Sequence, residues 1–256
     1  MLFYFTATGN SLYAARAIEP DPISIPQIWH SAQRDFTADA IGIVAPVYGH
    51  ELPPMVQQFI RQSTFHTDYF YLVLTYGNRH GGAAELAEQL CRACGIAPSY
   101  INVLLMVDNW LPAFDMEEER KKDKQVDAHL AQIAADIADR RRFIAPVSEE
   151  DRAAHQSFLA RQRQLPADAW QHLIRVGEQC TGCGICQQVC PSGSIRLEQG
   201  RAVHHPGNCQ ACLACVHHCP VRAIGLSLPE KNPNARYRNE HIALSDIIAA
   251  NRQQPQ

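Results

Sequence analysis

The sequence predicts an α/β domain with a parallel sheet covered on both faces, followed by a small α+β domain built around cysteines. Short apolar runs alternate with segments of helical spacing over the first half of the chain, the pattern of a doubly wound sheet. Eight of the ten cysteines fall in two short runs, 180–191 and 209–220. The second run repeats the first after 29 residues, which indicates a small domain made of two similar units.

Apolar runs predict strands at residues 2–5, 41–44, 70–74 and 101–107, with a short extra one at 23–25. Helical spacing predicts helices at 10–18 and 83–94, and a third begins at 56 after two prolines. Residues 116–142 are predicted to form one long helix. The charge run at 117–124 is expected to be its solvated beginning.

We expect four parts along the chain. Residues 1–142 form the α/β domain, and residues 143–172 form a helical connector in which Ser148 begins a new helix after Pro146. Residues 173–228 form the cysteine domain. Residues 229–256 form a polar tail that is expected to be only partly ordered.

Composition excludes several classes of protein. The 46% of hydrophobic residues suffice for a normal core, and the net charge of −3 is not the basic footprint of a nucleic-acid-binding domain. The apolar run at 2–5 is too short for a signal peptide. No run approaches the roughly 18 apolar residues of a membrane span. We therefore expect a cytoplasmic protein with no nucleic-acid partner and no membrane span.

The clustered cysteines suit either zinc or iron–sulfur clusters, because structural disulfides are rare in a reducing compartment. Zinc sites usually combine two pairs of ligands that are a dozen or more residues apart. In this chain three cysteines come at i, i+3 and i+6, and a fourth follows four residues later, directly before proline. This spacing favours two [4Fe–4S] clusters over zinc.

The two runs resemble those of bacterial-type two-cluster ferredoxins. The resemblance implies one cluster on Cys180, Cys183, Cys186 and Cys219, and another on Cys209, Cys212, Cys215 and Cys190. Gly182 and Gly184 would let the backbone lie close to the first cluster, with Ala211 and Ala214 expected in the corresponding places of the second run. Many carriers of this family are acidic, but residues 176–228 hold three arginines against two glutamates.

Other cysteines and histidines are expected to lie outside the ligand set. His204, His205, His217 and His218 are close in sequence to the runs, but the eight thiolates already fill every ligand position. Cys91 and Cys94 form a C-x₂-C pair that suits a redox pair or a buried apolar contact. We favour the buried contact, with Cys94 on the apolar face of its helix.

The segment TATGNS at residues 6–11 follows the first predicted strand and opens the first predicted helix. Hydroxyl groups and backbone N–H groups at a helix N-terminus form a cradle for phosphate. The segment lacks the lysine of a P-loop and the G-x-G-x-x-G of a dinucleotide site. It resembles the FMN phosphate loop of flavodoxins, and the matching residues are Thr6, Thr8, Gly9, Asn10 and Ser11.

The flavodoxin resemblance implies a sheet of order 2-1-3-4-5 with FMN where the strand order reverses. It also implies that two further loops flank the flavin, with candidate contacts at Val47, Tyr48, Gly49, Thr75, Tyr76, Gly77 and Asn78. The two tyrosines either border the flavin ring or cap the ends of strands. Residues 108–110 are a candidate for the same rim.

A flavodoxin-like domain followed by a two-cluster ferredoxin resembles the EFR-type flavodoxin–ferredoxin fusions. The resemblance implies an intracellular electron-transfer protein that relays electrons between two [4Fe–4S] clusters and FMN, with redox partner proteins as donor and acceptor. The alternative is an iron–sulfur flavin oxidoreductase that reduces a small substrate. A third hypothesis is a sensor without FMN. No acid–base pair is evident, so no catalytic residue is predicted.

Overall fold

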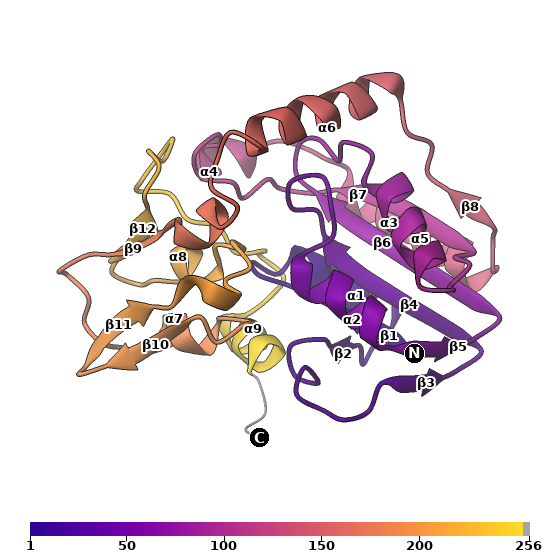
Figure 1. The fold of residues 1–256 in the computed structure, drawn as a ribbon, viewed down its shortest axis with the longest axis horizontal. Helices are drawn as coiled ribbons and strands as arrows, with labels where there is room; N and C mark the ends of the chain where they lie inside the picture. The colour runs from indigo at the N-terminus through magenta and orange to yellow at the C-terminus, as the bar shows by residue number, and fades with distance from the viewer. Residues whose placement is uncertain (253–256) are drawn as a thin grey trace.

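A six-stranded, wholly parallel sheet forms the centre of the larger unit in the computed structural model, which describes residues 1–252 (Figure 1). Its strands, in spatial order, are β2 (Ile23–Ser24), β1 (Leu2–Tyr4), β4 (Ala40–Pro46), β6 (Tyr69–Tyr76), β7 (Tyr100–Leu105) and β8 (Phe143–Ile144). The first five follow the flavodoxin-like order 2-1-3-4-5, and β8 extends the edge. The predicted fold class is confirmed.

Helices flank this sheet, and a small parallel pair of strands lies beside it. The helices are α1 (Asn10–Ile18), α2 (Pro54–Gln62), α3 (Ala83–Ala93), α4 (Met116–Glu119) and α5 (Val126–Ala138); the pair is β3 (Asp35–Thr37) and β5 (Thr64–His66). Helices α1 and α5 pack against each other. The core beneath the helices is aromatic, because Phe3 packs on Phe36 and Phe59 with ring centroids 4.8 and 5.0 Å apart.

The cysteine-rich unit is the left-hand lobe of Figure 1 and contains two short antiparallel pairs. Its elements are η1 (Ala169–His172), β9 (Ile174–Val176), α7 (Ile185–Gln188), β10 (Ile195–Glu198), β11 (Arg201–His204), η2 (Pro206–Asn208), α8 (Ala214–His217) and β12 (Ile224–Leu226). Strand β9 pairs with β12, and β10 with β11. The sequence repeat has a structural counterpart: the N–H groups of Ser194 and Ala223 each donate to the cysteine four residues earlier, both at 3.2 Å.

The single long helix predicted over 116–142 is wrong, because the chain breaks between α4 and α5. Gln125, just before α5, has a left-handed φ of 49°. Lys124 turns inward, where its ammonium group donates to the carbonyls of Gly77 and Met106 at 2.6 and 2.7 Å. It also pairs with Glu119 at 3.1 Å, and both side chains are less than a tenth exposed. The charge run is therefore partly an internal ion pair that anchors the ends of β6 and β7.

Replacing Lys124 by methionine should destabilise the fold by about 3 kcal/mol, because Glu119 and two buried carbonyls lose a partner. Burial would raise the pKa of Glu119, but hydrogen bonds from Lys122 and Lys124 outweigh it and hold this pKa below its ordinary 4.5. The stability from this carboxylate is therefore present above pH 4.5 and is lost as the pH falls through the lower folded value. Denaturant unfolding against pH should show a smaller acid loss in the variant.

Lys121→Met is the matched control, since Lys121 pairs with Glu118 on the exposed surface. This substitution should leave the unfolding free energy unchanged. Equal effects of the two substitutions would contradict the structural role assigned to Lys124.

The connector forms the helix that the sequence predicts, with Ser148 accepting from the Asp151 N–H at its start, whereas the tail is more ordered than the sequence predicts. The connector contributes β8 and then α6 (Glu149–Gln162), which crosses the top of the molecule in Figure 1. The expectation of a partly ordered tail is wrong as far as Arg252, and residues 253–256 lie outside the described part of the chain. The tail ends in α9 (Leu244–Asn251), which lies between the two lobes in Figure 1. Gln27 donates to Ala249 and Asn251 donates to Val189, so α9 is tied to both units.

Within residues 1–252, no helix combines the length and the apolar character needed to cross a membrane.

Candidate functional site

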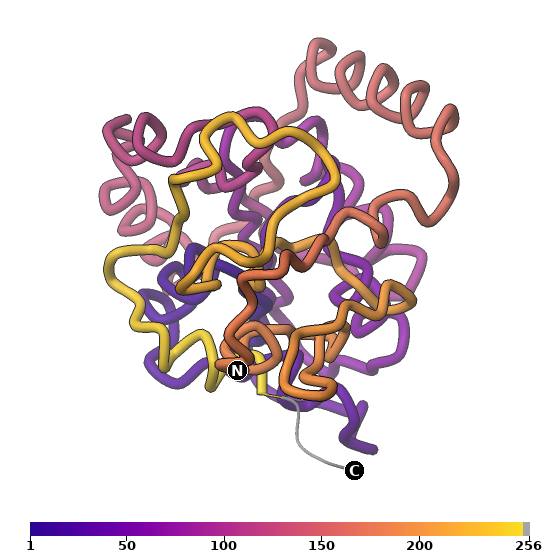
Figure 2. The backbone as a smooth tube through the Cα atoms, turned by 90° about the vertical axis from the view of Figure 1, so that its left-hand side faces the viewer, coloured from indigo at the N-terminus to yellow at the C-terminus, as the bar shows by residue number. Residues whose placement is uncertain are grey.

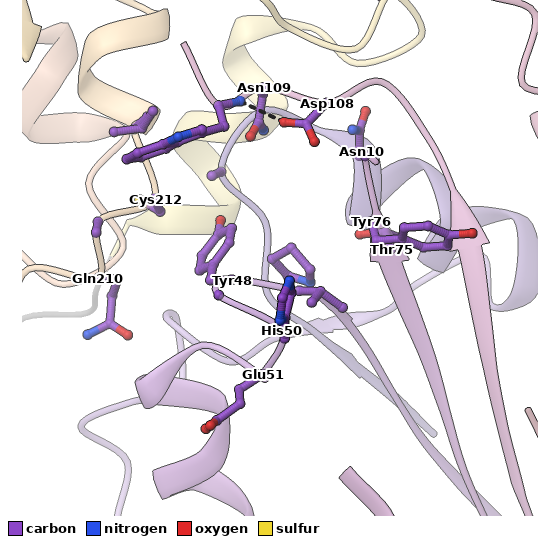
Figure 3. A pocket seen from close by; sticks show the side chains of 18 of the residues that line it. Asn10, Tyr48, His50, Glu51, Thr75, Tyr76, Asp108, Asn109, Gln210 and Cys212 are labelled. Carbon is purple, nitrogen blue, oxygen red and sulfur yellow. Dashed lines mark hydrogen bonds between the residues drawn. The ribbon is translucent and has the colours of Figure 1, made fainter. Parts of the chain in front are cut away.

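A cavity of about 510 Å³ opens at the carboxyl ends of β1, β4, β6 and β7. Four loops of the α/β unit surround it, at residues 6–11, 46–52, 75–79 and 107–110 (Figure 3). The reversal of strand order between β1 and β4 places the cavity where such folds bind their ligands. Every predicted flavin-site residue lines the cavity except Gly9, and Asp108, Asn109 and Trp110 line it as expected.

The loop at 6–11 is held by hydrogen bonds from its own residues and from neighbouring loops. Helix α1 begins at Asn10, after Gly9 in a left-handed conformation with φ 103°. The Gly9 N–H donates to Thr6 Oγ1 at 3.2 Å, and Asn109 donates to Thr8 Oγ1 at 2.7 Å. Ser11 Oγ lies 2.8 Å from Thr75 Oγ1. The N–H groups of the first turn have no carbonyl partner inside the helix, so the loop suits an anion.

The lining residues fit an FMN molecule. Thr6 and Thr8 each accept a hydrogen bond, which leaves each hydroxyl O–H to donate to a phosphate oxygen. Tyr48 Oη is buried and has no hydrogen-bond partner among residues 1–252, so this hydroxyl is able to form a hydrogen bond with a ligand in the cavity. The cavity volume lies in the range of cofactor sites, roughly 300–1,000 Å³. Both rings pack edge-on against an aromatic neighbour, Tyr76 on His80 and Tyr48 on Phe5, but the unpartnered hydroxyl makes Tyr48 the better candidate for a flavin contact.

The eight clustered cysteines form two groups, each drawn from both runs. Cys180, Cys183, Cys186 and Cys219 line one small cavity together. Burial raises the pKa of Cys209 to about 11 and that of Cys212 well above its ordinary value, and Cys190 contributes to both shifts. The structure thus brings Cys219 to the first triplet and Cys190 to the second. Irons would have to displace protons from these buried thiols, which is the usual coupling of metal binding to pKa.

The backbone around the two groups is nearly the same although the residues differ. Gly182 and Gly184 have φ of 69° and 78°, and their counterparts in the repeat, Ala211 and Leu213, have φ of 50° and 59°. The expected counterpart of Gly184 was Ala214, and this was wrong by one residue. In the second run, Ala211 and Leu213 thus have a Cβ although their backbone adopts a conformation that favours glycine.

The second run lies beside the large cavity, whereas the first lies at the surface. Gln210, Ala211, Cys212 and Leu213 all line the cavity. Desolvation, with a smaller contribution from Cys212, raises the pKa of Tyr48, and Figure 3 shows both side chains in the same wall. Cys183, in the first run, is exposed. From the surface of the lobe towards the large cavity, the first group of cysteines therefore comes first, the second group follows, and Tyr48 comes last.

Residues of the connector and the tail complete the site, although no motif in the sequence marks them. Phe158, Gln162 and Trp170 close one side of the cavity. On the outer side of the loop at 6–11, the Asn239 N–H donates to the Thr8 carbonyl at 2.8 Å, and Tyr237 Oη donates to Asn10 at 2.6 Å.

His217 and the cysteine pair at 91 and 94 lie outside the two thiol groups, as predicted. His217 is buried and donates from Nε2 to the Asn109 carbonyl at 2.9 Å, while its Nδ1 accepts from the Tyr237 N–H. It joins α8 to the cavity rim and to the tail. In the C-x₂-C pair, Cys91 is the fully buried residue, not Cys94. Burial raises the pKa of Cys91 to about 12, which suits an inert apolar contact.

Known proteins match the two units unequally. The family of the 4Fe-4S dicluster domain matches residues 172–220. The ferredoxin-like protein in the vnf region of Azotobacter chroococcum is 42% identical over 50 residues, which is 18% of this chain and 77% of that protein. One component of an ion-translocating oxidoreductase complex from Methanosarcina acetivorans is 45% identical over 47 residues, but the chain covers only 18% of that component.

Solved structures give weak similarities to the larger unit. The Trp repressor binding protein of Bacillus subtilis has a TM-score of 0.34 at 10% identity, covering 51% of this chain and 94% of that one. Rubredoxin oxygen:oxidoreductase from Desulfovibrio gigas has a TM-score of 0.32 at 13% identity. The match covers 54% of this chain and 36% of that one. These scores are too low to support an argument, so the fold assignment depends on the observed strand order.

Proposed function

Because the chain belongs to the ferredoxin-like proteins through its 4Fe-4S dicluster region, we propose that it relays electrons between two [4Fe–4S] clusters and an FMN bound in the large cavity. One observation carries the proposal: Cys212, from the second run, lines the same cavity as the loop at 6–11 and Tyr48. The proposed ligands are Cys180, Cys183, Cys186 and Cys219 for the first cluster, and Cys190, Cys209, Cys212 and Cys215 for the second.

Each part of the chain has a role in this relay. The loop at 6–11 holds the FMN phosphate through N–H groups and the hydroxyls of Thr6 and Thr8. Tyr48 positions the flavin beside the second run, while Phe158 and Trp170 keep water from that side of the cavity. When bound, FMN exchanges one or two electrons, which lets a one-electron cluster chain serve two-electron chemistry. Redox partner proteins supply or remove the electrons.

A second candidate function is a flavin oxidoreductase that reduces a small substrate in the same cavity. The observation in its favour is the aromatic wall of Trp110, Phe114, Phe158 and Trp170, which could cover a flat substrate as well as the flavin. Steady turnover of a small molecule with electrons supplied through the clusters would favour the oxidoreductase. Turnover with artificial dyes alone would favour the carrier.

The cofactor content tests the proposal first. Protein purified without oxygen should contain about eight irons, about eight sulfides and about one FMN per chain. Flavin is measured after acid extraction, and iron and sulfide by colorimetric assay. Full iron without flavin would contradict both candidate functions, and about one zinc per run would contradict the clusters themselves.

A further inference from the structure

The outer face of the cysteine-rich lobe exposes an apolar surface around the first group of thiols. Cys183 is exposed, and Leu197 and Val221 are 36% and 42% exposed. All three line the small cavity of that group. The loop between β9 and α7 and the β10–β11 hairpin lie at the outer edge of the lobe, away from the main sheet (Figure 1), and this lobe faces the viewer in Figure 2.

Three exposed arginines belong to the segments that form this apolar surface, and each hydrogen-bonds a neutral oxygen. Arg196 and Arg201 donate to the carbonyls of Gly193 and Gly177, both at 3.1 Å, and Arg222 donates to Asn234 Oδ1 at 3.2 Å. The nearby Glu198 is paired with His205 at 2.6 Å. Glu178 is also exposed in the β9–α7 loop, so three arginines stand against two glutamates and the face has a net charge of +1 around an apolar centre.

The charge of this lobe is opposite to that of the chain as a whole. Residues 173–228 hold four arginines against two glutamates, whereas the whole chain has 23 basic and 26 acidic side chains. The proposed cluster would occupy the space among the thiols of the first group, which leaves no room there for a small organic donor. A donor must therefore act across the surface, and the positive rim favours an acidic one.

We propose that this face, formed by Cys183, Leu197 and Val221 with Arg196, Arg201 and Arg222, docks an acidic protein that carries one electron on an exposed iron–sulfur centre. The proposal depends on the proposed relay. One electron leaves the reduced centre of the partner and enters the chain at the first cluster. The partner is oxidised by one electron, the chain is reduced by one, and no bond or proton is exchanged. The apolar centre gives contact area, and the arginines steer the encounter.

The test reverses the three charges, as Arg196→Glu, Arg201→Glu and Arg222→Glu together, in the fully loaded protein. The probe is a reduced acidic bacterial ferredoxin, and its Kd is measured by calorimetry without oxygen. We expect Kd to rise about tenfold in about 50 mM salt and to change less than about twofold in about 500 mM salt, since salt screens the rim charges. A control triple reversal of exposed Arg61, Arg142 and Arg163, which lie outside the lobe, should leave Kd within about twofold.

A second variant tests the apolar centre. Leu197→Ser with Val221→Ser should raise Kd at both salt concentrations, because apolar contact is not screened. The proposal is overturned if the reversal leaves Kd unchanged, if the control has the same effect, or if sedimentation shows the face occupied by a second copy of this chain.

Dithionite separates this proposal from the relay. It should reduce the clusters at the same rate in all variants, because it is a small reductant that needs no docking surface. Weakened ferredoxin binding with normal reduction by dithionite supports the docking face. If reduced clusters fail to pass electrons to the flavin in every variant, the relay fails while the docking result stands.

Discussion

Replacing Cys212 by alanine is expected to halve the iron content, from about eight to about four irons per chain. Cys212 and Cys215 are buried and Cys209 is half-buried, and no other cysteine of the second run is available to replace Cys212. The first group keeps all four thiols, so its cluster should assemble normally. Iron and sulfide analysis measures the loss, and low-temperature electron paramagnetic resonance of the reduced protein identifies the cluster that remains.

Each proposed cluster takes three thiols from one run and the fourth from the other run. This crossed assignment gives the prediction a sharp control. Cys219→Ala should remove the same cluster as Cys183→Ala, although Cys219 lies in the second run, because both line the small cavity of the first group. Cys94→Ala, which alters a half-buried thiol outside the runs, should keep the full iron content. If Cys219→Ala and Cys212→Ala left the same remaining spectrum, the crossed assignment would be wrong.

Gly9→Ala is expected to remove most of the flavin and to destabilise the fold by about 2–3 kcal/mol. A Cβ at this position would lie 2.9 Å from the Cβ of Asn239 and 3.1 Å from that of Ile242, with a left-handed φ of 103°. The loop would have to move away from the tail, and the N–H groups at the start of α1 would move with it. Flavin content after purification and denaturant unfolding measure the two effects.

Gly95→Ala separates conformational strain from this close contact. Gly95 also has a left-handed φ, 77°, but a Cβ there would meet nothing within 4 Å. We expect a loss of about 1 kcal/mol and unchanged flavin content. Equal losses in the two variants, with flavin retained in both, would show that the tail does not hold the loop.

The sequence predicted the parts of the site that carry local motifs. The cysteine spacing is that of the 4Fe-4S dicluster family, and the loop at 6–11 has hydroxyl and N–H groups at a helix start, so both features were evident from single short segments. The strands were predicted because a buried parallel strand is apolar along its whole length. These signals depend on neighbours in the chain, not on distant contacts.

The parts that were missed depend on tertiary contacts. Residues 116–142 are rich in strong helix formers, which favours one continuous helix. The break in the helix lets Lys124 form two hydrogen bonds with backbone carbonyls and an ion pair with Glu119. Helix α6 has His155 as its buried residue and no apolar stripe, so nothing in its sequence shows that Phe158 closes the cavity. The polar tail carried no signal of order, because its hydrogen bonds join it to residues far away in sequence: Asn251 donates to the Val189 carbonyl, and Gln27 donates to the Ala249 carbonyl.

In the proposed relay, electrons reach the flavin through the second cluster. The most direct test mixes loaded protein rapidly with a reduced ferredoxin and follows the cluster and flavin absorbance bands. In the wild type, bleaching of the flavin band should follow bleaching of the clusters. In Cys212→Ala reconstituted with FMN, the first cluster should bleach and the flavin band should persist. Flavin bleaching at the same rate in both proteins would contradict the relay.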